Sequence, residues 1–237
     1  MTENRWSSEL LTQRVATIRE NIAEAARVSG RSAEDISLMA VTKTIPAEVV
    51  NLIYGCGIHL FGENRAQELC GRYDTYDFDA SAIHFIGALQ TNKVRQIIDK
   101  VSCIQSVDSL HLAKEIDKRA CQVGKTMRVF LEVNIGAEPS KSGVLPEELP
   151  YLTEQAACLS NILVCGLMTI PPAMKNCDET RSYFDQMYKL FVDIKHKKID
   201  NVTMEYLSMG MSADYQLAIQ SGANLIRIGS GIFGSRT

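Results

Sequence analysis

The sequence predicts an α/β protein built as a single TIM (β/α)8 barrel domain over residues 1–237. Eight strand-like apolar runs alternate with helical patterns, without a linker or a break in composition. The chain of 237 residues has the size expected of eight such units. Polar and glycine-rich residues gather where the strands end, which is the face that carries the active site in this fold. A doubly wound open sheet remains the alternative, because periodicity does not show whether a sheet closes.

Composition limits the classes of partner. Hydrophobic residues make up 46% and charged residues 22% of the chain, and the formal net charge is -3. This balance gives no electrostatic reason to bind nucleic acid or an anionic membrane. No apolar run approaches the length of a transmembrane helix, and residues 1–6 lack the apolar core of a signal peptide. We therefore expect a soluble cytoplasmic protein.

The seven cysteines are scattered, and no pair has C-x-x-C spacing. An odd number without motif spacing favours reduced thiols in the cytoplasm over disulfides or a zinc site. No metal site is expected.

The first half of the chain predicts an N-terminal helix and four strand–helix units. Ser7 and Ser8 are N-cap candidates, apolar residues follow at helical spacing, and Gly30 ends the helix. The apolar positions of this helix are Leu11, Val15, Ile18, Ile22 and Ala25. The expected strands are residues 36–43, 58–61, 83–87 and 103–107. The expected helices are residues 46–56, a segment through 66–70, residues 92–98 and residues 108–124, the last one capped by Asp108-Ser109.

The second half predicts four more strands. They are residues 127–134, 162–169, 203–207 and 224–228, separated by helices at 147–159, at a segment marked by Tyr183, Met187, Leu190 and Ile194, and at 212–222 with Ser212 as N-cap. Residues 136–143 form a loop with the composition of a mobile lid.

Lys43 ends the first strand, at the rim of the predicted core. Partial desolvation there lowers the pKa of an amine and makes it available for Schiff-base chemistry. The alternative is a lysine that only extends into solvent, as most lysines at strand ends do.

The last two loops have the character of a phosphate cradle. Ser212 follows the seventh strand, and Gly229, Ser230 and Gly231 follow the eighth. Glycines allow close approach of the backbone, and barrels commonly bind phosphate with these two loops. The pattern Gly229-x-Gly231-x-x-Gly234 also fits a dinucleotide fingerprint, but the chain ends at Thr237 without room for the helix which that motif requires.

A Schiff-base lysine facing a phosphate site across the barrel mouth suggests pyridoxal phosphate (PLP). Arg227 precedes Gly229 by two residues and lies on the same face of the strand, so it can reach the pyridine nitrogen. A guanidinium there disfavours protonation of that nitrogen, which makes the ring a poor electron sink. The alternative for Arg227 is a salt bridge that closes the barrel.

Short motifs occur in order over nearly the whole chain. They are Ala40-Val41-Thr42-Lys43-Thr44, Phe61-Gly62-Glu63-Asn64, His84-Phe85-Ile86-Gly87, Leu89-Gln90, Asn92-Lys93, Ser140-Lys141-Ser142-Gly143, Gly166-Leu167-Met168, Leu207-Ser208-Met209-Gly210-Met211-Ser212 and Arg227-Ile228-Gly229. In these motifs the chain resembles the YggS/PROSC family of pyridoxal phosphate homeostasis proteins. Thr42 and Ser230 depart from the serine and threonine usual there, and both keep a hydroxyl.

The resemblance implies a barrel like the N-terminal domain of bacterial alanine racemase, which is PLP fold type III, with PLP held as a Schiff base on Lys43. It implies a role in controlling intracellular PLP, and no catalytic residue. Asn64 and Met168 are expected to line the ring, Arg227 to face its nitrogen, and the cradle to hold the phosphate. The expected cofactor-binding residues are Asn64, Met168, Ser208, Ser212, Arg227, Gly229 and Ser230.

Two enzymatic alternatives stay open. A racemase-type enzyme needs a second acid–base group from an appended β-domain, and we do not expect that domain because the chain ends nine residues after Ile228. His84, Lys93 and Lys141 remain other candidate bases. A cofactor-free Schiff-base aldolase needs a carboxylate beside Lys43, and Glu63 is the candidate. We predict a PLP-binding monomer rather than an enzyme, with PLP-dependent client enzymes as its possible partners.

Overall fold

The strands close into a barrel. The computed structural model describes residues 5–172 and 176–234, and all eight strands pair in parallel, each with its neighbour in sequence. The first strand pairs with the last, with Met39 opposite Arg227, so the barrel prediction is confirmed and the open sheet is excluded. The strands are β1 (Ser37–Val41), β2 (Phe61–Glu63), β3 (Ile83–Phe85), β4 (Cys103–Val107), β5 (Met127–Glu132), β6 (Ile162–Met168), β7 (Val202–Ser208) and β8 (Leu225–Ile228). The expected domain also includes residues 1–4, 173–175 and 235–237, which lie outside the described residues.

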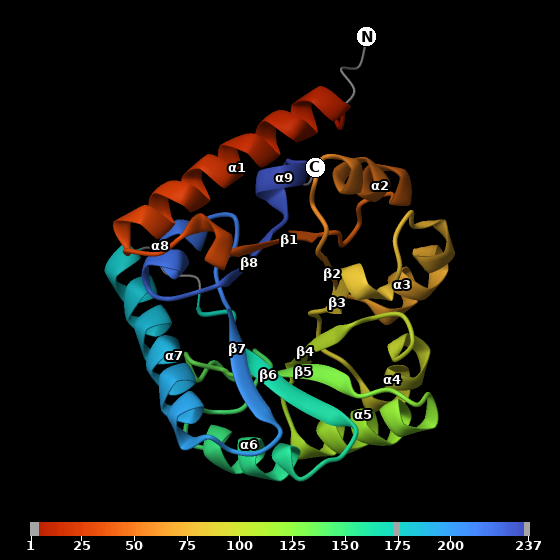
Figure 1. The fold of residues 1–237 in the computed structure, drawn as a ribbon, viewed down its shortest axis with the longest axis vertical. Helices are drawn as coiled ribbons and strands as arrows, with labels where there is room; N and C mark the ends of the chain where they lie inside the picture. Colours follow the sequence, from red (N-terminus) through yellow and green to blue (C-terminus); the bar gives the residue numbers. More distant parts are fainter. Residues whose placement is uncertain (1–4, 173–175, 235–237) are drawn as a thin grey trace.

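Helices surround the barrel (Figure 1). They are α1 (Ser8–Val28), α2 (Ala47–Gly55), α3 (Ala66–Arg72), α4 (Thr91–Ile97), α5 (Leu110–Gln122), α6 (Leu149–Ala157), α7 (Cys177–Lys197), α8 (Tyr215–Gln220) and α9 (Ser230–Phe233). Ser7 caps α1 and Ser109 caps α5, each by accepting a hydrogen bond from a backbone N–H of the first turn, as the sequence predicts. Within the described residues, no helix is both long and apolar enough to cross a membrane.

The second strand lies further along the chain than predicted. Residues 58–61 were expected, but β2 covers Phe61–Glu63. The N–H of Ile58 still bonds to the carbonyl of Ile53 at the end of α2, so the segment before Phe61 finishes the helix connection. The apolar run predicts that a strand is present, but the backbone hydrogen bonds place the start of the strand three residues later, at Phe61.

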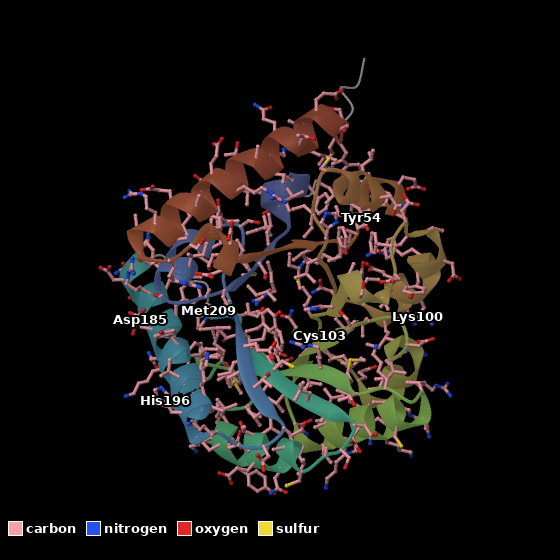
Figure 2. The ribbon with its side chains drawn as sticks, viewed as in Figure 1. Tyr54, Lys100, Cys103, Asp185, His196 and Met209 are labelled. Carbon is pink, nitrogen blue, oxygen red and sulfur yellow. The ribbon has the colours of Figure 1, made fainter. Side chains whose placement is uncertain are left out.

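The core has two layers. Strand residues that point outwards pack against the helices, and those that point inwards form a separate cluster inside the barrel. Figure 2 shows Cys103 near the barrel centre and His196 on the outer face of α7. The inner cluster consists of Met39, Ile86, Cys103, Phe130, Cys165, Met168 and Leu225. It fills the barrel beneath its carboxyl-terminal mouth, so a ligand can enter only above it.

Candidate cofactor site

Lys43 lies at the mouth, two residues beyond the end of β1. Met39 belongs to the inner cluster and Val41 packs against it, so strand alternation gives Lys43 the inward-facing register. The side chain of Lys43 is half-buried. The residue before it, Thr42, is wholly buried and donates a hydrogen bond to Oε1 of Glu63 at 2.6 Å. This contact fixes the backbone from which Lys43 projects.

Glu63 is fully buried and committed to structural contacts. Its carboxylate accepts two hydrogen bonds from Nη2 of Arg72, at 2.9 and 2.6 Å, and one from the hydroxyl of Tyr76 at 2.8 Å. Thr42 supplies the fourth hydrogen bond. Burial, followed by the charge of Glu63, raises the pKa of Tyr76. A carboxylate that accepts four hydrogen bonds is not available for proton transfer beside Lys43, which argues against the aldolase hypothesis.

Asn64 follows β2 on the same side of the strand as Gly62. Its Oδ1 is buried and has no hydrogen-bond partner among the residues that the structure describes. The backbone is packed closely here, because a Cβ at Gly87 would overlap the carbonyl oxygen of Asn64. An unpartnered buried acceptor is costly, so a donor from a ligand fits this position.

Met168 ends β6 and is fully buried in the inner cluster. It therefore forms part of the floor of the mouth. This position suits the ring-lining role predicted for it.

Arg227 is a buried cation on β8, with 3% of its surface exposed. Its Nη1 donates to Oγ of Ser208 at 2.6 Å and its Nη2 donates to the carbonyl of Thr169 at 2.8 Å. Desolvation lowers the pKa of Arg227 to about 10, while the charges of Glu132 and Asp214 oppose this shift. The guanidinium thus stays charged at neutral pH. Within the described ranges it forms no ion pair, so the salt bridge proposed as an alternative is not seen there.

Ser212, Gly229 and Gly231 of the predicted cradle lie in contact, but Ser212 does not have the helix-capping role expected of it. Ser212 does not cap a helix, because α8 begins at Tyr215 with Asp214 in the N-cap position. Its Oγ instead accepts hydrogen bonds from the N–H groups of Gly229 and Gly231, at 3.3 and 3.0 Å. Two backbone donors that converge on one oxygen can also hold an oxygen of an anion.

The cradle lies beside Lys43 rather than across the mouth from it. Barrel closure sets β8 next to β1, as Figure 1 shows, and a Cβ on Gly229 would lie 3.6 Å from the Cβ of Val41. Ser230 is exposed and begins α9. The sequence could not show this neighbourhood, because it depends on which strands pair.

Known proteins are similar to this chain over nearly its whole length. The family model of the alanine racemase N-terminal domain matches residues 14–237. A protein of Aquifex aeolicus named pyridoxal phosphate homeostasis protein is 42% identical over 225 residues, which cover 94% of this chain and 97% of that protein. The chain belongs to the family of pyridoxal phosphate homeostasis proteins. A second pyridoxal phosphate homeostasis protein, from Pseudomonas aeruginosa, is 35% identical, with 95% of this chain and 96% of that protein covered.

A solved structure links the family to its cofactor. PipY of Synechococcus elongatus with PLP bound superposes with a TM-score of 0.80 at 30% identity, covering 94% of this chain and all of PipY. The structure of PipY without PLP superposes with a TM-score of 0.85 at 31% identity. Alanine racemase of Clostridium difficile gives 0.72 at 18% identity over 96% of this chain and 60% of the racemase, which shows the shared fold alone. The expected alanine racemase-like barrel is confirmed.

Hydrogen bonds hold the loop at residues 136–143 in place. The side chain of Asn134 donates to the carbonyl of Glu138 at 2.8 Å and accepts from its N–H at 3.1 Å. Nζ of Lys141 donates to the carbonyl of Pro171 at 2.8 Å. Gly143 has φ of 109°, and a Cβ there would lie 2.5 Å from the N of Asn134. These contacts oppose the mobility that the composition suggested.

Two buried polar residues of the strands escaped sequence analysis, namely Gln105 and Glu132. Gln105 is wholly buried on β4, and a single amide in an apolar strand was the available signal. Glu132 ends β5 and is nearly buried, and burial raises its pKa to about 7, with a smaller contribution from Asp108. In the sequence, nothing distinguishes Glu132 from a glutamate on the surface.

Proposed function

We propose that this chain binds PLP at the barrel mouth, as a Schiff base on Lys43, and acts in intracellular PLP homeostasis without catalytic turnover. The observation that carries the proposal is the buried, charged Arg227 beside the first strand, within the same mouth as Lys43 and the cradle. The fit of the residues supports it: a primary amine, an unpartnered acceptor, a fixed cation and convergent N–H donors match an aldehyde, a ring hydroxyl, a ring nitrogen and a phosphate.

Each predicted residue has a role in this proposal. Lys43 forms the covalent bond, Met168 supports the ring, and Asn64 accepts from the ring hydroxyl. Arg227 donates to the ring nitrogen and Ser208 orients Arg227. Ser212, Gly229 and Ser230 hold the phosphate.

Arg227 favours binding over catalysis. When bound, PLP can stabilise carbanions if its ring nitrogen is protonated. A charged donor at that nitrogen keeps it unprotonated, so carbanion formation is weakly supported. The names of the relatives likewise indicate homeostasis.

A racemase-type activity is the second candidate, and one observation favours it. Glu132 is a nearly buried carboxyl at the mouth whose pKa of about 7 suits proton transfer near neutral pH. Aldolase chemistry has no such support, because Glu63 already accepts four hydrogen bonds from Arg72, Tyr76 and Thr42.

We also infer that the chain acts as one barrel unit over residues 1–237, as a cytoplasmic monomer that passes PLP to client enzymes. Light scattering of the purified protein tests the monomer, since a dimer would double the measured mass.

The central test is borohydride reduction of the PLP-incubated protein followed by peptide mass mapping. We expect a reduced phosphopyridoxyl group on Lys43, and none after Lys43→Ala. Lys93→Ala serves as the matched control and should keep the adduct. No adduct with excess PLP would refute the cofactor, whereas an adduct on Lys93 or Lys141 would refute the assigned anchor. Turnover of amino acids by the loaded protein, lost in Glu132→Gln, would favour the racemase-type alternative.

A further inference from the structure

A chain of polar side chains, three of them buried and His84 half-buried, crosses the barrel interior and ends on Arg227. Oγ of Ser208 lies 2.6 Å from Nη1 of Arg227 and 2.7 Å from Oε1 of Gln105. Nε2 of Gln105 lies 2.8 Å from Nδ1 of His84. The four residues come from β8, β7, β4 and β3, so the chain spans the barrel between strands that do not pair, except for β7 with β8 and β3 with β4. We call it the Arg227 relay.

The donor chemistry of Arg227 and the orientation of the Gln105 amide together give the relay a direction. A guanidinium can only donate, so Ser208 must accept from Arg227. The single proton of the Ser208 hydroxyl is then directed to Oε1 of Gln105. The amide of Gln105 consequently turns its NH2 group towards His84, which can accept only if Nδ1 carries no proton.

The surroundings of His84 favour this state. Burial, with a smaller contribution from the charge of Arg128, lowers the pKa of His84 to about 3. The imidazole packs edge to face against Phe130, with ring centroids 6.1 Å apart, which restrains its plane. His84 is thus a neutral acceptor with its remaining proton on Nε2.

We propose that Ser208, Gln105 and His84 are positioning residues that hold Arg227 towards the cofactor ring through a one-way relay of hydrogen bonds, with neutral His84 as its terminal acceptor. The inference rests on the proposed function, because the ring nitrogen is the partner that Arg227 is held for. Each bond in such a chain polarises the next, so the Ser208 oxygen becomes a stronger acceptor for Arg227 than an isolated hydroxyl. The guanidinium therefore keeps one orientation, which the bonds to Ser208 and to the carbonyl of Thr169 define.

The first measurement concerns the protein without PLP. Nitrogen and carbon chemical shifts of His84, assigned with His84→Gln, report which ring nitrogen carries the proton. We expect the Nε2–H form in the native protein. In Gln105→Glu a carboxylate oxygen faces Nδ1, so His84 should change to the Nδ1–H form or become charged. An Nδ1–H form in the native protein would overturn the relay, whatever the protein binds.

The second measurement is PLP affinity, followed by absorbance titration. Gln105→Met removes the acceptor of Ser208 at nearly constant volume and should weaken binding about tenfold, within the range for a hydrogen bond between neutral groups. Ser208→Ala should have a similar effect. The double variant should bind like Ser208→Ala alone, because Gln105 acts only through Ser208. Gln13→Met, at an exposed position on α1, is the matched control and should bind normally.

Equal losses from Gln105→Met in the native and Ser208→Ala backgrounds would overturn the relay, since they would indicate an independent structural effect. If the native protein binds no PLP, the proposed function is refuted. The relay is then tested by the protonation state of His84 alone, which is measured without PLP. If Gln105→Met does not fold, Gln105→Leu replaces it and should weaken PLP binding by a similar factor, because it also removes the acceptor of Ser208.

Discussion

The buried ion pair between Glu63 and Arg72 gives a quantitative prediction for the neighbourhood of Lys43. Arg72 supplies two of the four hydrogen bonds to a carboxylate with no exposed surface, at 2.9 and 2.6 Å. Arg72→Met leaves that carboxylate buried with only the hydroxyls of Tyr76 and Thr42. Removing one partner of a buried pair costs about 3–5 kcal/mol. For a chain of this length, such a loss lowers the melting temperature by about 6–20 °C.

Urea and thermal unfolding at pH 7 measure this effect. Arg65→Met is the matched control, because Arg65 pairs with Glu68 on the surface with 72% of its side chain exposed, and its loss should be below about 1 kcal/mol. The double variant Glu63→Gln/Arg72→Met removes the uncompensated charge and should recover much of the lost stability. The reasoning fails if Arg72→Met unfolds like the control, or if the double variant is no more stable than Arg72→Met.

Two further predictions concern the mouth. The folded-state pKa of Glu132 is raised to about 7 from a usual value near 4.5, so its ionisation opposes folding, and stability should fall by up to about 3 kcal/mol as pH rises from about 4.5 to 7. Urea unfolding of Glu132→Gln should show a flatter profile over this window; an unchanged slope would contradict the assignment. Gly87→Ala should destabilise the protein and weaken PLP binding, because its Cβ overlaps the carbonyl of Asn64, whereas Gly71→Ala, with open space on α3, should not. Equal melting temperatures for the two alanine variants would argue against that steric cause.

The elements were predictable where local chemistry determines them. The caps of α1 and α5 and the apolar runs of the strands depend on neighbouring residues, and the structure confirms them. Residues that end strands could be assigned to one face, because parallel strands of a barrel all end there. Lys43, Asn64 and Arg227 were assigned to this face in this way, and their roles in binding PLP stay predictions.

Other features depend on long-range pairing, which one sequence does not reveal. The place of Gly229 beside Val41 follows from closure between β1 and β8. The partner of Ser208 is Gln105, more than one hundred residues away in the chain. Ser212 satisfied a local rule for helix capping, but its hydroxyl is used by the N–H groups of another loop.

The contact of Ser212 with Gly229 and Gly231 has a consequence for exchange of an anion. The hydroxyl oxygen already supplies an acceptor to both N–H groups, so the protein without an anion does not leave these donors unsatisfied. An arriving phosphate replaces or joins an internal acceptor, and its net gain is therefore smaller than at a site with unpaired donors. When the phosphate leaves, the hydroxyl can take its place. In the proposed role in PLP homeostasis, release of the phosphate therefore costs less free energy than at a site whose N–H donors would then stay unpaired.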